Sequence, residues 1–280
     1  MSVLELYHTV NSVCSQKVRI QLKEKALDWT SHPMTLRGDQ FSEEYLKLNP
    51  NGVVPTLIHD EQPVIESSVI LYYLEECFPD VRLMPKDPLA RANVRLFNKL
   101  IDEYVHNACT VLTFAIAFRS RFQKMNSTDL EDYLSSAPNK TRSEQKRDVI
   151  AHGLDSKFCV EAIEHFVKLL QRIEHSACGH DYLAGNEFSL ADVAVIPYLI
   201  RLDMLRLSPI WGSYNALPKW YERVRSRPAV EHAIIGCMTQ SDNAPFEQIE
   251  FDSWSYIGRV LKQNGTSISK ISCLATSGHC

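Results

Sequence analysis

The sequence has no long hydrophobic run. Its longest strongly apolar stretch, Val111–Phe118, is far shorter than the roughly 20 residues that a transmembrane helix needs. The first residues, 1–7, form neither a basic leader nor an apolar export signal. We therefore expect no membrane span and a cytoplasmic location.

The chain also lacks paired cysteines and a strong excess of one charge. None of the 8 cysteines has Cys-x-x-Cys spacing, so neither a zinc site nor a dithiol redox motif is indicated, and no metal is expected. The net charge of -4 gives no reason to expect binding to nucleic acid. What is present is a chain of 280 residues, 45% hydrophobic and 23% charged, which is typical of a folded protein with room for two domains.

The first 82 residues have the pattern of a small α/β domain. Alternating apolar residues indicate strands, and apolar residues at helical spacing indicate helices between them. Strands are expected at residues 4–7, 29–36, 53–58 and 64–65, and helices from near Ser15 and over residues 69–77. The order is βαβ followed by ββα, with a hairpin between the last two strands.

Beyond a linker at residues 83–90, every periodic segment is helical, so residues 91–237 are predicted to form an all-α domain. Residues 119–150 are polar and are interpreted as a solvated helix extension and a loop. Ser189 opens a later helix and Asp192 stands three residues on, which is the spacing of a capping box.

Residues 238–280 form an appended extension whose composition differs from the rest. Trp254 and Ile257 have helical spacing, so one helix is possible there. The end is rich in Ser, Thr and Gly, and residues 266–280 are expected to be mobile.

Four short motifs together resemble the soluble glutathione transferase family over roughly residues 3–235. They stand at the first strand-to-helix turn, at a turn before a proline, at a helix start and at the capped helix: Ser12–Arg19, Asn49–Pro55, Ile65–Ser68 and Phe188–Asp192. The first motif is similar to zeta-class enzymes and tetrachlorohydroquinone dehalogenases. The Asp102–Tyr104 segment is similar to bacterial β-etherases.

The resemblance implies a thioredoxin-like domain that binds glutathione over residues 1–82, followed by the helical domain. It also implies that glutathione attacks an apolar or aromatic electrophile, by conjugation, ether cleavage or reductive dehalogenation. Glutathione and a small apolar electrophile are then the ligands, and a homodimer is expected. The alternative is a non-catalytic binding or assembly module, which the extra segment at residues 241–280 favours.

The thiol of glutathione has to be stabilised as an anion, because a free thiol has a pKa of about 8.5. Ser12, Cys14 and Ser15 stand where the first helix begins, and a hydroxyl at a helix N-terminus can stabilise a thiolate. The resemblance implies Ser12, Cys14 or Ser15 in different classes, and Ser12 is our preferred donor. Ser15 can instead be only an N-cap, and Cys14 only a buried small residue.

The resemblance also implies how the rest of glutathione is held. Glu66 and Ser67 would bind the γ-glutamyl end. The peptide between Val54 and Pro55 would be cis and would pair with the cysteinyl unit, and Gln40 would meet the glycine carboxylate.

The pocket of the second substrate is expected between the loop after the first strand and the long helix of the second domain. Core packing is an equally good interpretation for each candidate. The candidates are His8, Thr9, Tyr104, Ala108, Val111 and Leu112.

Overall fold

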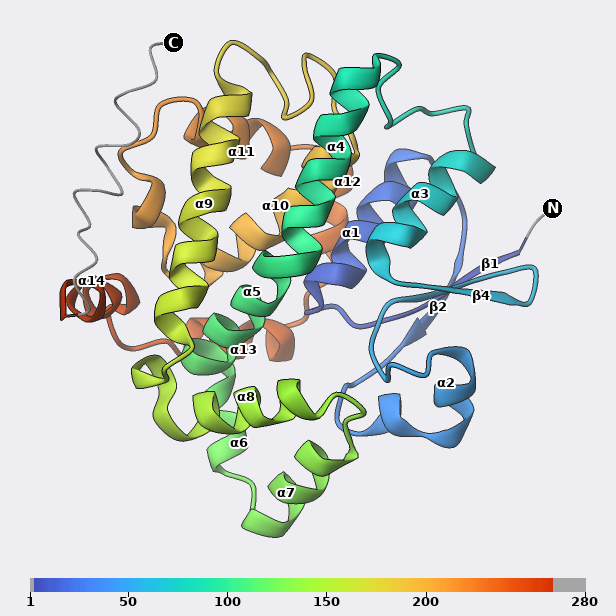
Figure 1. Cartoon of the computed structure of the whole chain (residues 1–280). Helices are drawn as coiled ribbons and strands as arrows, with labels where there is room; N and C mark the ends of the chain where they lie inside the picture. Colours follow the sequence, from blue (N-terminus) through green and yellow to red (C-terminus); the bar gives the residue numbers. More distant parts are fainter. Residues whose placement is uncertain (1–2, 264–280) are drawn as a thin grey trace.

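A four-stranded mixed sheet forms the first part of the chain in the computed structural model, which describes residues 3–263 (Figure 1). The strands are β1 (Leu4–His8), β2 (Thr30–Pro33), β3 (Thr56–His59) and β4 (Gln62–Ile65), in the order β2-β1-β3-β4. β1 runs parallel to β2 and antiparallel to β3, and β3 and β4 form the expected hairpin. Leu4 and Leu6 alternate with less buried residues on β1, which gives this strand one core-facing side.

Three helices complete this thioredoxin-like domain: α1 (Val13–Glu24), α2 (Glu43–Leu48) and α3 (Ser67–Cys77). The N-cap of α1 is Ser12 and not Ser15, because the Ser12 side chain accepts a hydrogen bond from the Ser15 amide. The expected order, βαβ followed by ββα, is confirmed. α1 lies between the sheet and the helical domain and also packs on α3, α10 and α12.

The second part of the chain is helical. One continuous helix runs from residue 88 to residue 123 and contains two π-helical segments, η2 and η3. Its first residue, Pro88, lies inside the predicted linker. The helices and short turns from here to the end of the capped region are α4 (Pro88–Leu100), η2 (Ile101–Val105), α5 (His106–Thr113), η3 (Phe114–Phe118), α6 (Arg119–Gln123), α7 (Ser127–Ser136), α8 (Lys140–His152), η4 (Gly153–Asp155), α9 (Cys159–Ala177), α10 (Leu190–Met204), η5 (Ser208–Trp211), α11 (Leu217–Arg225) and α12 (Pro228–Ile234).

Residues 119–150 differ from the prediction, because they form three helices rather than an extension and a loop. The side chain of Asn126 caps α7, and that of Asn139 caps α8. Only a few apolar residues of this segment, such as Phe122 and Leu134, are buried. The helices therefore depend on capping and on a narrow apolar side, which the mixed polar composition conceals.

The capping box at Ser189 is confirmed at the start of α10, which is the most deeply buried helix of the domain. The carboxylate of Asp192 accepts hydrogen bonds from the amides of Leu183 and Ser189 and from the indole of Trp220. These contacts tie α10 to α11 in the middle of the core.

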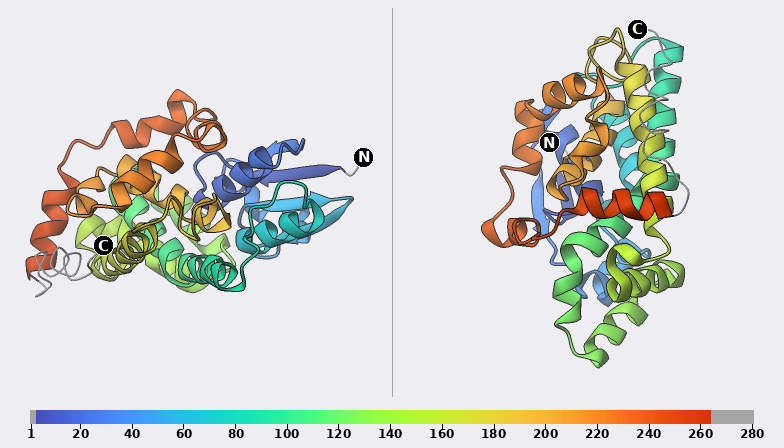
Figure 2. Two further views of the ribbon diagram at one scale, coloured as in Figure 1. Left: turned by 90° about the horizontal axis from the view of Figure 1, so that it is seen from above. Right: turned by 90° about the vertical axis from the view of Figure 1, so that its left-hand side faces the viewer.

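Residues 238–263, the described part of the extension, hold two helices where one was expected. They are α13 (Gln240–Glu247), which Thr239 and Asp242 begin with a second capping box, and α14 (Ser253–Gln263). α13 approaches the loop after β1, where the Asn11 side chain donates to the carbonyl of Asp242 at 3.1 Å. α14 lies across one end of α9, away from the sheet (Figures 1 and 2). The expected mobility of residues 266–280 concerns positions outside the described residues.

No helix within residues 3–263 is long and apolar enough to cross a membrane.

Candidate active site

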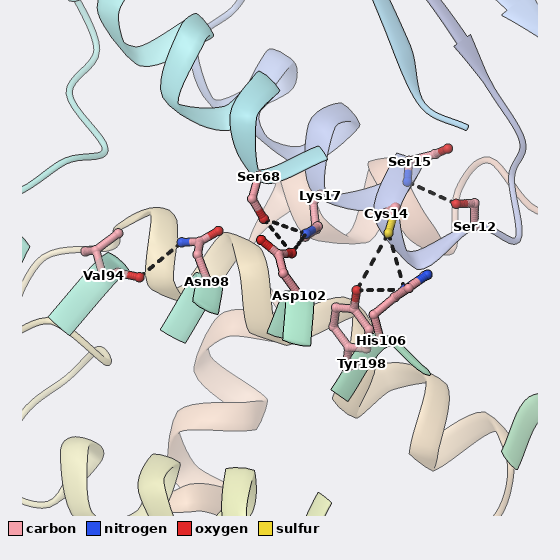
Figure 3. Close-up of polar contacts among 10 residues, drawn as sticks. All are labelled: Ser12, Cys14, Ser15, Lys17, Ser68, Val94, Asn98, Asp102, His106 and Tyr198. Carbon is pink, nitrogen blue, oxygen red and sulfur yellow. Dashed lines mark hydrogen bonds and ion pairs between the residues drawn. The ribbon is translucent and has the colours of Figure 1, made fainter. Parts of the chain in front are cut away.

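The first turn of α1 holds the three residues expected to act on the glutathione thiol. The Oγ of Ser12 accepts a hydrogen bond from the Ser15 amide at 3.2 Å. Ser15 is fully buried, and its hydroxyl has no hydrogen-bond partner among the residues described. Cys14 is half-buried, and its sulfur points toward the helical domain (Figure 3). Ser12 and Cys14 are thus more accessible to a ligand than Ser15 is.

Two side chains of the helical domain meet the sulfur of Cys14. The Nδ1 atom of His106, at the start of α5, lies 3.4 Å from Sγ, and the hydroxyl of Tyr198, on α10, lies 3.7 Å from it. His106 Nδ1 and the Tyr198 hydroxyl are 3.3 Å apart, so the three groups form a triangle (Figure 3). π-helical segments often mark functional positions, and His106 directly follows η2.

The surroundings of Cys14 favour its thiolate. Burial alone raises the pKa of this thiol, but the charge and hydrogen bond of His106, the charge of Lys17 and a hydrogen bond with Ser67 overcome that effect. The pKa falls from 9.0 to about 6. Burial raises the pKa of Tyr198 well above its ordinary value, so its hydroxyl keeps the proton that it can share with the sulfur.

Two other buried cysteines show what happens without such partners. Burial raises the pKa of Cys109 to about 11 and that of Cys159 to about 12. At neutral pH these two remain thiols, whereas Cys14 is mostly a thiolate. Burial is the largest contribution to the pKa shift of all three thiols, and it raises the pKa in each. The difference between their pKa values therefore comes from the other groups around each sulfur.

A buried lysine contributes to the positive field at this turn. Lys17 is fully buried on α1, and its Nζ donates to the Ser68 hydroxyl at 3.1 Å. Ser68 donates in turn to Asp102 at 2.8 Å, and Lys17 Nζ lies 3.6 Å from the same carboxylate oxygen (Figure 3). These contacts join α1, α3 and η2, so the two domains are linked beside Cys14.

The residues expected to hold the γ-glutamyl and cysteinyl parts of glutathione lie at the edge of the same domain. The Val54–Pro55 peptide bond is cis, as expected. Glu66 has φ +67°, a strained value for a residue with a side chain, and its Oε1 accepts from the Asn51 side chain at 3.0 Å. Ser67 is the first residue of α3, where free amides favour an anion. Strain of this kind is concentrated at ligand sites.

Gln40 lies in η1 (Asp39–Phe41), the short turn that precedes α2. It is buried, and its Oε1 accepts a hydrogen bond from the Gly38 amide at 3.1 Å. The side chain is therefore held in place by its own loop.

The residues expected to line the second pocket are divided among several places. Tyr104, Ala108 and Val111 line a cavity of about 270 Å³ together with residues of α8 and α9. Neither Cys14 nor His106 is among its lining residues. The cavity is thus a separate feature from the thiolate site.

Of the other three candidates, His8 and Leu112 are buried and Thr9 is half-buried. Leu112 is fully buried in the helical core. Arg19 donates to His8 Nδ1 at 3.2 Å and to the Thr9 carbonyl at 3.0 Å. Burial, followed by the charge of Arg19, lowers the pKa of His8 to about 4, so this histidine is neutral at physiological pH.

Sequence reasoning missed His106, Tyr198 and Lys17. His106 and Tyr198 are separated from Cys14 by 92 and 184 positions. A helical pattern shows that such residues lie on a helix, but it does not show which distant residue they meet. Lys17 stands within the first motif. Its position three residues after Cys14, on the same face of one helical turn, is the sequence signal that places it near that cysteine.

Known proteins share both domains and this order of elements. Residues 11–77 match the family model of the glutathione S-transferase N-terminal domain, and residues 158–228 match that of the C-terminal domain. A probable maleylacetoacetate isomerase of Caenorhabditis elegans is 40% identical over 202 residues, which cover 72% of this chain and 80% of that protein. The chain belongs to the glutathione S-transferase family.

Other relatives of this glutathione S-transferase extend the match. Protein LigF of Sphingobium sp. is 29% identical over 237 residues, covering 81% of this chain and 91% of that protein. The crystal structure of the β-etherase LigF has a TM-score of 0.73, with 28% identity and coverage of 82% and 98%. Glutathione S-transferase TCHQD of Arabidopsis thaliana is 27% identical over 238 residues, covering 82% and 89%.

These relationships support glutathione-dependent catalysis by this transferase. Across residues 3–263, no cluster of three or more His, Cys, Asp or Glu side chains is arranged to hold a metal ion.

Proposed function

We propose that this glutathione S-transferase joins glutathione to an apolar, aromatic electrophile and then uses Cys14 to remove the glutathionyl group. The observation that carries the proposal is the half-buried Cys14, whose pKa of about 6 results from partners that oppose its burial. A thiolate of this kind is a nucleophile at neutral pH. The similarity to a protein described as a β-etherase supports an aromatic ether as one class of electrophile.

In the first step the glutathione thiolate attacks the carbon that bears the leaving group. The carbon–sulfur bond forms, and the bond to the leaving oxygen or halogen breaks with its electron pair. Ser12 is the proposed donor to the glutathione thiolate, because its oxygen accepts from the Ser15 amide and leaves its own proton available. Glu66, Ser67, the cis peptide at Pro55, and Gln40 are the proposed glutathione contacts.

In the second step the Cys14 thiolate attacks the glutathione sulfur. A disulfide forms between Cys14 and glutathione, and the carbon group leaves with the electron pair and takes up a proton. A second glutathione thiolate then frees Cys14 and leaves as glutathione disulfide. Overall, two glutathione thiols are oxidised to a disulfide, and the bond between carbon and the leaving group is replaced by a carbon–hydrogen bond. The step requires a carbon anion that a neighbouring carbonyl or ring stabilises.

A homodimer and a cytoplasmic location are further parts of the proposal. Three apolar side chains are exposed on α3 and α4: Val69 at 53%, Leu89 at 73% and Leu96 at 38%. Exposed apolar residues on neighbouring helices are typical of an interface. We expect a dimer by light scattering at micromolar concentration, and Leu96→Glu to shift it toward the monomer. A monomeric parent protein would contradict this part of the proposal. A reducing cytoplasm would keep Cys14 available.

S-phenacylglutathione tests the second step directly, because its leaving group is a carbonyl-stabilised carbanion. With glutathione, the parent enzyme should release acetophenone and glutathione disulfide. Cys14→Ala should abolish this reaction while glutathione conjugation to 1-chloro-2,4-dinitrobenzene continues. Cys109→Ala is the matched control, because it removes a buried thiol of raised pKa. Equal release of acetophenone by the parent and by Cys14→Ala would show that Cys14 does not remove the glutathionyl group.

A further inference from the structure

Six aromatic rings form a continuous row between the glutathione domain and α13. Neighbouring rings have centroid separations of 6.3, 5.4, 5.3, 5.7 and 5.8 Å along the row. In order, the rings are Phe41, Tyr133, Phe122, Phe114, Phe118 and Phe246. We call this set the aromatic row.

Both ends of the aromatic row lie beside segments expected to bind glutathione. Phe41 directly follows Gln40, at the glycine end. Phe246 belongs to α13, and this helix is held by Asn11, the neighbour of Ser12 at the thiol end. The row therefore begins beside one of these expected segments and ends on the helix that contacts the other.

The faces of the row are partly open. Phe122 and Phe246 are buried, but Phe41, Phe114, Phe118 and Tyr133 are only half-buried. Half-buried aromatic rings present apolar area to a flat ligand, which can stack on them or meet their edges.

Three cations stand over rings of the aromatic row, and none of them has a carboxylate partner among the residues that the structure describes. Lys146 Nζ lies 5.0 Å from the Phe114 centroid and 5.7 Å from that of Tyr133. Arg121 lies over Phe122 at 5.4 Å, and Arg201 over Phe246 at 4.9 Å. Within residues 3–263, none of the three cations forms an ion pair with an acidic side chain.

Lys146 is the half-buried cation of this set that has no polar partner among the described residues, whereas Arg121 is exposed to solvent. Arg201 has polar partners, since it donates to the Asn11 carbonyl at 2.7 Å. Lys146 has only ring faces around its ammonium group, among the contacts of the described residues. Burial, followed by the nearby charge of Arg142, lowers its pKa to about 8, which reflects a cation that lacks an anion.

We propose that the aromatic row binds the ring of the electrophile and that Lys146 binds an anionic group on that ring. The substrate class is then an aromatic electrophile with a carboxylate or a similar anion. This inference rests on the proposed transfer of glutathione to an aromatic electrophile. An anion at Lys146 would supply the missing countercharge, and a charge-assisted contact in a half-buried place is stronger than one in open solvent.

Two matched substrates test the proposal: 4-chloro-3-nitrobenzoate, which is anionic, and 4-chloro-3-nitrobenzamide, which is neutral. In both, glutathione displaces chloride from the same ring carbon. Lys146→Met keeps the length of the side chain and removes the charge. We expect it to raise KM for the benzoate by about tenfold or more, with kcat nearly unchanged and the benzamide reaction within about twofold. Lys146→Arg should restore most of the preference for the anion.

The control variant is Lys168→Met, which removes the charge of an exposed lysine on α9. It should leave both reactions unchanged. Equal losses with the benzoate and the benzamide in Lys146→Met would show a structural role for the lysine and overturn the proposal. Unchanged kinetics with both substrates in this variant would overturn it as well.

A binding measurement separates this proposal from the proposed catalytic function. The anionic aromatic dye 8-anilinonaphthalene-1-sulfonate should bind the parent protein without glutathione, and Lys146→Met should weaken that binding by about tenfold. If no electrophile reacts but the dye shows this loss, the catalytic proposal fails and the anion subsite stands. If the dye binds Lys146→Met and the parent equally, the subsite is absent whatever the activity.

Discussion

Replacing His106 by asparagine should remove the main support of the Cys14 thiolate. The imidazole supplies both a nearby charge and a hydrogen bond, and these are the two largest contributions that lower the pKa of Cys14. Burial, which raises the pKa, would remain. The fall from 9.0 to about 6 corresponds to about 4 kcal/mol in favour of the thiolate. Without His106 we expect the pKa to return to the value of an ordinary thiol or above it.

The consequence at neutral pH is large. With a pKa of about 6, about nine in ten Cys14 side chains are thiolates at pH 7, and in His106→Asn about one in a hundred would be. Alkylation by iodoacetamide over a range of pH, followed at Cys14 by peptide mass spectrometry, reports this ionisation. The exposed thiol of Cys77 is an internal reference in the same digest.

The matched control is His165→Asn, which removes a histidine from α9. It should leave the alkylation profile of Cys14 unchanged. The reasoning fails if His106→Asn has the same midpoint as the parent protein. It also fails if His165→Asn moves the midpoint equally, because the effect would then not depend on contact with the sulfur.

Three further outcomes are expected. Glu66→Ala and Ser67→Ala should each weaken glutathione binding, measured by calorimetry, by about 1.5–3 kcal/mol, and unchanged affinity in both would place the γ-glutamyl end elsewhere. Asp192→Ala should lower the free energy of unfolding by at least about 3 kcal/mol, because it leaves the Trp220 indole and two buried amides unpaired. A loss below about 1 kcal/mol in urea titration would contradict this. Between about pH 6 and pH 8.5 the parent should gain stability over Cys14→Ala as the pH rises, by at most about 3 kcal/mol. The reason is that the unfolded thiol binds a proton in this range and the folded thiolate does not. A constant difference in stability would mean that Cys14 titrates as an ordinary thiol.

Local patterns in the sequence predicted much of the fold. The hairpin of β3 and β4 follows from two apolar runs around a short turn, and the capping box at Ser189 follows from its spacing to Asp192. Both depend only on residues close together in the chain. The same kind of pattern, Thr239 with Asp242, precedes α13 and was overlooked because the extension was treated as mostly irregular.

At the start of α1, the sequence predicted only those residues of the candidate site that stand together in the first motif. Ser12, Cys14 and Ser15 stand together in the sequence, and the structure distinguishes them by burial: Ser15 is enclosed and Cys14 is half-buried. The groups that lower the pKa of Cys14 come from other helices, so one sequence cannot pair them with it. The second pocket was expected between the loop after β1 and the long helix, and that expectation does not say which side of α5 faces the sulfur.

The thiolate and the aromatic row depend on the same continuous helix. His106 begins α5, directly after η2, and Phe114 and Phe118 belong to η3, directly after α5. His106 and Phe114 are eight positions apart with only the regular helix α5 between them, so this helix can face the sulfur at one level and the row at another. The rotation between these levels is fixed by the backbone of α5. The partner of the thiolate and the wall proposed for the electrophile are therefore held by a single element, and in these proposals the helical domain contributes to the chemistry as well as to the pocket.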